Sequence, residues 1–129
     1  MLYSVGYQMR QDTEWMETIV RNKAFLKEVY FSFGDIPNGR NSQWSCSGFL
    51  PHEAQEKQLA DLSFLAENGI PLNLLYNGNC YGENAQSRAF FRQIGDTVDY
   101  FAARFGLRSV TTTSPLIGRF VKENFRGLD

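Results

Sequence analysis

The sequence predicts an α/β fold in which four strand–helix units place four strands side by side in one parallel sheet. Two observations support this prediction. Extended apolar runs alternate along the chain with segments whose apolar residues recur at helical spacing. The intervals between the runs suit the crossover helices that parallel strands require. The 129 residues are enough for one domain with one hydrophobic core.

Composition excludes several classes of protein. The chain is 43% hydrophobic and 15% aromatic, which excludes an intrinsically disordered protein. Lys and Arg number 13 against 14 Asp and Glu, so no surplus of positive charge favours a nucleic-acid partner. No uncharged apolar run reaches the roughly 18 residues of a membrane span. The first ten residues lack the pattern of a secretory signal, so the two cysteines are expected as reduced thiols in the cytoplasm.

The first two strands and the helix between them follow from local signals. Residues 2–9 form the first predicted strand, and Asp12 or Thr13 is positioned to cap the following helix. The apolar stripe of that helix comprises Trp15, Met16, Ile19 and Val20. Residues 26–33 form the second predicted strand, which ends at Gly34.

The middle of the chain holds a long loop, a helix and the third strand. The loop covers residues 34–51 and is rich in Gly, Asn, Ser and Pro. Pro51 suits the first turn of the next helix, because the N–H that proline lacks would be unpaired there. The apolar stripe of this helix comprises Leu59, Leu62, Leu65 and Ala66. Asn68 and Gly69 end the helix, and residues 70–76 form the third predicted strand.

Two further helices flank the fourth strand. A helix over residues 86–105 places one set of apolar side chains on one side: Phe90, Ile94, Val98, Phe101 and Phe105. Gly106 ends this helix, and residues 107–113 form the fourth predicted strand. Ser114 and Pro115 begin the last helix, whose apolar residues are Leu116, Ile117, Phe120 and Val121.

Four such units fit two architectures, half of a (β/α)8 TIM-type barrel or a small doubly wound open sheet. A doubly wound sheet buries both faces of its central strands, whereas a barrel strand turns one face inward toward other side chains and substrate. Val29 and Phe31 alternate with more polar neighbours, and the other strands also have one richer apolar face. This alternation favours the half barrel, with residues 1–129 as a single domain that forms the N-terminal half of a larger barrel. Because half a barrel leaves strand edges unpaired, we expect it to bind a second copy of itself or a missing C-terminal half.

Ligands of parallel α/β proteins bind at the carboxyl ends of the strands, so the loops that follow the strands carry the predicted site. Glycines in these loops let the backbone approach a ligand, and amides both donate and accept hydrogen bonds. The residues predicted to bind a small-molecule or peptide substrate are Gln8, Arg40, Asn77, Asn79, Tyr81 and Thr113. The alternative for any one loop residue is a turn-rich connection, since Asn-Gly is a favourable turn pair.

Three residues of the same loops are candidates for catalysis, namely Asp35, Cys80 and Glu83. A nucleophilic Cys80 needs a base, and spacing does not support the chain's one histidine, His52, in that role. Asp35 and Glu83 are a potential acid–base pair or ligands of a divalent metal; alternatively, Asp35 caps a turn and Glu83 is solvated. Two cysteines and one histidine fall short of a zinc signature, so no metal site is predicted. The residues indicate no particular cofactor.

The segments EVYFSFGDIPNGR, IPLNLLYNGNCYGENA and VTTTSPLIGRFVKENF overlap the second, third and fourth predicted strands. Together these segments resemble the collagenase-like peptidases of family U thirty-two, and more closely their uncharacterised bacterial relatives. The likeness covers most of the chain and corresponds to the N-terminal half of that family's TIM-type barrel. The family's cysteine-rich signature belongs to the later half.

The resemblance implies a barrel enzyme, a peptidase-like hydrolase with its site at the carboxyl rim of the strands. Other branches of the family take part in oxygen-independent hydroxylation or RNA base modification, and the hydroxylation relatives hold an iron–sulfur cluster on four cysteines. This chain has only Cys46 and Cys80, so one copy does not supply a complete cluster site. A non-catalytic binding or assembly domain on the same fold is the alternative from another functional class.

Overall fold

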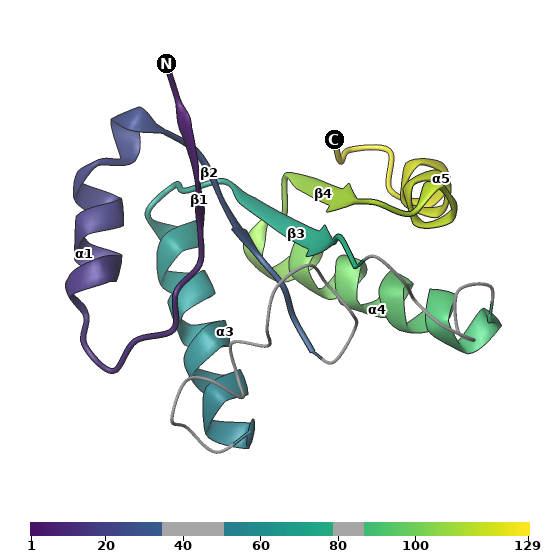
Figure 1. The fold of residues 1–129 in the computed structure, drawn as a ribbon, viewed down its shortest axis with the longest axis horizontal. Helices are drawn as coiled ribbons and strands as arrows, with labels where there is room; N and C mark the ends of the chain where they lie inside the picture. The colour runs from purple at the N-terminus through teal and green to yellow at the C-terminus, as the bar shows by residue number, and fades with distance from the viewer. Residues whose placement is uncertain (35–50, 79–86) are drawn as a thin grey trace.

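Strands and helices alternate along the chain (Figure 1). The computed structural model describes residues 1–34, 51–78 and 87–129. The strands are β1 (Tyr3–Gly6), β2 (Leu26–Phe31), β3 (Leu72–Tyr76) and β4 (Ser109–Thr112). The helices are α1 (Glu14–Arg21), α3 (Pro51–Glu67), α4 (Arg88–Phe105) and α5 (Pro115–Asn124), with a short 3-10 helix, η1 (Lys23–Phe25), before β2. The predicted α/β fold is confirmed.

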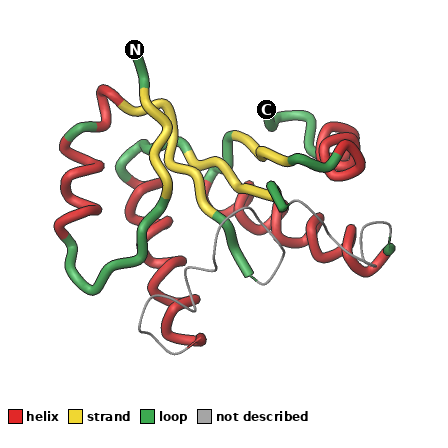
Figure 2. Tube along the Cα trace, viewed as in Figure 1, coloured by secondary structure: helices red, strands yellow, loops and turns green. Residues whose placement is uncertain are grey.

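The four strands form one parallel sheet in the order β1-β2-β3-β4. A doubly wound sheet reverses its strand order at a switch point, and this order contains no reversal. Each connection in this sheet leads to the next strand on the same side of the previous one. Right-handed connections of this kind place all their helices on one face of the sheet. Accordingly, α1 contacts α3, α3 contacts α4, and α4 contacts α5. Figure 2 shows the strands side by side in one sheet, with α1 at the left of the view and α5 at the right.

The hydrophobic core lies between the sheet and this helix layer. Phe101 of α4 is fully buried there, and its ring centroid lies 5.0 Å from those of both Phe31 and Phe33. The other apolar side chains with 1% exposure or less in the core are Tyr7, Val29, Ala54, Leu62, Leu65, Leu72, Leu74, Tyr76, Ile94, Val98 and Ile117. Alternate residues of each strand therefore face the helices. No helix within the described ranges is long and apolar enough to span a membrane.

Capping side chains set the beginnings of three helices. At α4, the Ser87 hydroxyl accepts a hydrogen bond from the backbone N–H of Phe90 at 3.0 Å. The Ser114 hydroxyl accepts a hydrogen bond from the backbone N–H of Ile117 at 3.3 Å, with a proline in the first turn of α5. At α1, the Asp12 carboxylate accepts a hydrogen bond from the backbone N–H of Glu14 at 3.2 Å. Thr13 makes no capping bond through its side chain. Of the two predicted capping residues, Asp12 therefore supplies the hydrogen bond.

Two glycines have the left-handed backbone that the predicted helix ends require. Gly69 has φ of 78° and Gly106 has φ of 62°, a region that side chains with a Cβ rarely adopt. Of the four apolar residues of the last helix, Leu116 is 46% exposed. Helix α5 buries Ile117 and Val121 instead, since successive helical residues point about 100° apart and Leu116 falls outside the buried stripe.

Candidate functional site

The face of the sheet opposite the helices, here called the open face, is mostly polar. Strand pairing places Ser4 beside Glu28. It also places Asn73 between Tyr30 and Ser109. Paired residues of neighbouring strands point to the same side of a sheet. The open face therefore comprises Ser4, Gly6, Glu28, Tyr30, Asn73, Leu75, Ser109 and Thr111.

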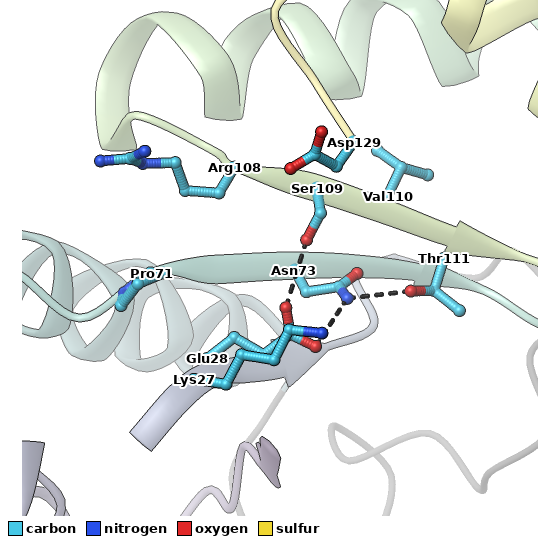
Figure 3. Close-up of a pocket in the computed structure, with 9 residues that line it drawn as sticks. All are labelled: Lys27, Glu28, Pro71, Asn73, Arg108, Ser109, Val110, Thr111 and Asp129. Carbon is cyan, nitrogen blue, oxygen red and sulfur yellow. Dashed lines mark hydrogen bonds between the residues drawn. The ribbon is translucent and has the colours of Figure 1, made fainter. Parts of the chain in front are cut away.

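A hydrogen-bonded cluster surrounds the Glu28 carboxylate on this face (Figure 3). The hydroxyl of Ser4 donates to Glu28 Oε1 at 3.2 Å, and that of Ser109 donates to Oε2 at 3.3 Å. The Asn73 amide donates to Glu28 Oε1 at 3.0 Å and to Thr111 Oγ1 at 2.9 Å. The cluster thus links side chains from all four strands.

Two hollows on the open face share part of this cluster. Their volumes are about 480 Å³ and 290 Å³. Glu28, Asn73 and Thr111 line both hollows, which therefore form one trough along the strands. The larger hollow lies toward the amino ends of the strands, and its other lining residues are Lys27, Pro71, Arg108, Ser109, Val110 and Asp129. The smaller hollow extends toward the carboxyl ends through Tyr30, Leu75 and Asn77.

Charged residues of both signs line the larger hollow, namely Lys27, Arg108, Glu28 and Asp129. Among the described residues, Glu28 takes part in no ion pair. Arg108 lines the larger hollow, but in Figure 3 its guanidinium points away from Glu28. Asn73 is only 5% exposed, and its Oδ1 has no hydrogen-bond partner within the described part of the chain. A buried acceptor without a partner costs about 1–3 kcal/mol, so Asn73 is an unusual feature of a folded protein.

Two of the predicted substrate-binding residues lie at the adjacent carboxyl ends of β3 and β4. Asn77 lines the smaller hollow. The Thr113 hydroxyl donates a 2.7 Å hydrogen bond to the carbonyl oxygen of Gly78, the residue after Asn77. Gln8 follows β1 but is exposed and lines neither hollow. The trough therefore reaches the predicted edge of the sheet at Asn77.

The remaining predicted site residues, Asp35, Arg40, Asn79, Cys80, Tyr81 and Glu83, lie outside the described residues. Their roles in catalysis and binding stay predictions. His52 is exposed on the first turn of α3.

Sequence reasoning did not single out Glu28, Asn73, Ser109 or Thr111 as site residues. It placed function in the loops after the strands, whereas these four lie within strands. The sequence did contain one signal for this cluster: β2, β3 and β4 each carry a polar residue on the face opposite their apolar residues. Only the strand register shows that these residues meet, because pairing brings together positions 45 and 81 residues apart.

A second polar cluster lies on the helix side of the sheet. Asp61 of α3 is 7% exposed and accepts hydrogen bonds of 2.6 Å from the Tyr7 hydroxyl and from Lys57 Nζ. Burial raises the pKa of Tyr7 far above its ordinary value of 10, and the hydrogen bond to Asp61 and the charge of Asp61 raise it further. Because each carboxylate oxygen already has a donor, this cluster is a structural link between β1 and α3.

Within the described residues, no three His, Cys, Asp or Glu side chains gather in a group able to hold a metal ion. The chain matches no family model, no curated protein and no solved structure. Its function is therefore inferred from the open face and from the motifs of the sequence.

Proposed function

We propose that this chain forms half of a (β/α)8-type barrel enzyme, a peptidase-like hydrolase of the collagenase-like kind. It acts on a peptide or small-molecule substrate at the carboxyl edge of the open face, in the cytoplasm. The observation that supports this proposal most strongly is a singly wound sheet whose helix-free face is polar and hollowed by a trough that reaches Asn77. In barrels the helix-free face points inward, and substrates bind at the carboxyl ends of the strands.

The proposed catalytic groups follow adjacent strands. Asp35 comes shortly after β2, and Cys80 and Glu83 come shortly after β3. Since β2 and β3 are parallel neighbours, the loops after them begin at the same edge of the sheet. There, one carboxylate would act as general base toward the attacking water or the Cys80 thiol, and the other would protonate the leaving amine.

The outer edge of β4 also supports a larger barrel. The Asp129 N–H donates to the carbonyl oxygen of Arg108 at 3.1 Å, and the Val110 N–H donates to the carbonyl oxygen of Asp129 at 3.0 Å. Asp129 thus bonds to the residues before and after Ser109, which is how a residue of a parallel strand pairs with its neighbour in a sheet. In the proposed barrel, a second copy or a C-terminal half provides the strands that continue the sheet from this edge.

Peptide hydrolysis with single-residue variants tests the proposal. The purified protein is incubated with a mixture of fluorogenic peptides, and its oligomeric state is measured by light scattering in the same preparation. We expect Cys80→Ala, or the pair Asp35→Asn and Glu83→Gln, to lower kcat/KM at least about a hundredfold. Cys46→Ala and Asp99→Asn serve as matched controls. Hydrolysis that all of these variants retain would contradict the assigned site.

A non-catalytic assembly domain is the second candidate, and exposed apolar residues near β1 favour it. Leu2 and Tyr3 are each 58% exposed at the edge strand β1. In this alternative, the protein forms a stable dimer and hydrolyses no peptide. Leu2→Ser combined with Tyr3→Ser would then convert the dimer to a monomer.

A further inference from the structure

The outer edge of β4 can pair with a longer parallel strand than Asp129 provides. Backbone N–H and C=O groups of successive strand residues point alternately to the two sides of the strand. The Thr113 N–H donates to the carbonyl oxygen of Tyr76 in β3, whereas the Val110 N–H donates outward to Asp129. The carbonyl oxygen of Val110 and the N–H of Thr112 therefore also point outward, beyond Asp129. No backbone hydrogen bond within the described residues uses either group.

An apolar hollow of about 330 Å³ lies beside this edge, between β4 and α5. The side chains of Val110 and Thr112 face it, and these two alternate with the open-face residues of β4, so the hollow is on the helix side of the sheet. Val121 and Leu128 form its other apolar walls, and Gly118 contributes no side chain. The hollow is therefore open to a side chain from a strand added beside β4.

The opposite edge of the sheet carries an apolar side chain that suits this hollow. Tyr3 is 58% exposed in the edge strand β1. It pairs with Leu26, which packs against the core, so Tyr3 lies on the helix side of the sheet. Met1 and Leu2, just before β1, are also exposed. An exposed apolar side chain at one edge and an apolar hollow at the other thus lie in the same layer.

Strand β1 also has the alternation that a strand beside β4 needs. Asp129 stands opposite Ser109, which belongs to the open face, so the next position along β4 faces the helices. Tyr3 at that position enters the hollow. Ser4 then lies opposite Thr111 on the open face, a polar residue beside a polar residue. Asp129 keeps both of its hydrogen bonds in this arrangement.

We propose that a second copy of this chain completes the barrel, with β1 of each copy paired to β4 of the other and Tyr3 of each copy in the hollow of the other. A twofold axis makes both contacts equivalent, because β1 and β4 run in the same direction. Two copies supply eight strands, the number in a TIM-type barrel. The inference rests on the barrel of the proposed function and commits its other half to a second copy.

Light scattering of the purified protein over a range of concentrations measures the dimer. The unaltered protein should reach twice the mass of one chain, and a monomer at every concentration would overturn the proposal. Gly118→Glu places a carboxylate at the apolar hollow, so it should raise the dissociation constant of the dimer at least about tenfold. A Cβ at Gly118 lies 3.6 Å from Thr112 Cγ2, an ordinary contact, and Glu is a better helix former than Gly, so this variant should stay folded. Gln93→Glu adds the same charge at an exposed position of α4 and should leave the dissociation constant unchanged.

A variant of the other edge shows which edges pair. Tyr3→Ser should also raise the dissociation constant at least about tenfold, whereas Phe64→Ser, at an exposed aromatic residue of α3, should not. An equal mixture of Tyr3→Ser and Gly118→Glu should form dimers more readily than either variant alone, because one of its two contacts joins an intact Tyr3 to an intact hollow. If Gly118→Glu dimerises like the unaltered protein, or the mixture shows no gain, β1 does not pair with β4 and the proposal is overturned.

Oligomeric state and peptide hydrolysis give separate answers. A dimer that responds to these variants as expected but hydrolyses no peptide supports this interface and contradicts the proposed hydrolase. A protein that hydrolyses peptides as a monomer supports the hydrolase and overturns the interface.

Discussion

The phenol of Tyr7 donates a 2.6 Å hydrogen bond to the carboxylate of Asp61 and thereby joins the carboxyl end of β1 to the middle of α3. Tyr7 is 1% exposed and Asp61 is 7% exposed. The ring of Tyr7 also lies edge-on to Trp15 of α1, with centroids 5.8 Å apart. This contact therefore ties the first strand to two helices of the layer.

Removing the Tyr7 hydroxyl should destabilise the fold. A hydrogen bond to a charged group contributes about 1.5–3 kcal/mol, so Tyr7→Phe should lower the free energy of unfolding by that amount. Urea denaturation followed by circular dichroism measures it. Tyr100→Phe removes a hydroxyl from a residue that is 36% exposed, and it should change the free energy of unfolding by less than about 0.5 kcal/mol. Equal effects of the two substitutions would contradict the role of the Asp61 bond.

The raised pKa of Tyr7 predicts a loss of stability in alkaline solution. The folded protein retains the Tyr7 proton at a pH where the unfolded chain, with a pKa near 10, releases it. The stabilisation is therefore fully present below about pH 10 and falls as the pH rises, by up to about 1.4 kcal/mol per pH unit. Urea denaturation between about pH 8 and pH 11 should show a steeper loss for the unaltered protein than for Tyr7→Phe. Parallel curves would refute the assignment to Tyr7.

Truncation of Phe101 should be among the most damaging changes in the core. Its ring contacts Phe31 and Phe33 edge-on and is fully buried. Phe101→Ala should cost about 3–5 kcal/mol, from lost burial and from the cavity left behind. Phe25→Ala, at a residue 60% exposed, should cost less than about 1 kcal/mol. Thermal and urea unfolding measure the loss of stability in both variants. A loss at Phe101 no larger than that at Phe25 would contradict the position of Phe101 at the centre of the core.

The backbone at Gly106 predicts a graded response to substitution. Its φ of 62° disfavours any residue with a Cβ, although Asn tolerates this region better than Ala. No atom lies within 4 Å of a Cβ built at this position, so strain rather than a clash sets the cost. Gly106→Ala should destabilise by about 1 kcal/mol and Gly106→Asn by less. A larger loss for Asn than for Ala would contradict the left-handed conformation.

The hydroxyl of Thr113 should hold the backbone at the edge where the proposed site begins. It donates a 2.7 Å hydrogen bond to the carbonyl oxygen of Gly78. Thr113→Val keeps the shape and removes this bond, so it should cost about 0.5–1.5 kcal/mol. Amide hydrogen exchange should become faster from Tyr76 to Gly78 in this variant. Thr97→Val on α4 is the matched control, and unchanged exchange at Gly78 would argue against the role of Thr113.

Much of the fold was predictable because it depends on residues close together in the chain. The alternation around Val29 and Phe31 predicts which face of β2 is buried, and Pro51 begins α3 as its chemistry predicts. Gly106 ends α4 for a similar local reason. The strands are shorter than predicted, and β1 ends at Gly6 instead of residue 9. Tyr7, for example, follows β1, and its N–H still donates to the carbonyl oxygen of Tyr30.

The sequence by itself determined the order of strands and helices, their caps and their buried faces, because periodicity and helix-end chemistry act over a few residues. Only the tertiary structure decided that the sheet is singly wound and that Asn73 meets Glu28, 45 positions away. It also decided that Asp61 is buried beneath Tyr7. Strand order and register depend on which segments pair across the whole chain. No local pattern encodes that pairing, and so the polar cluster of the open face emerged only when the strands were placed side by side.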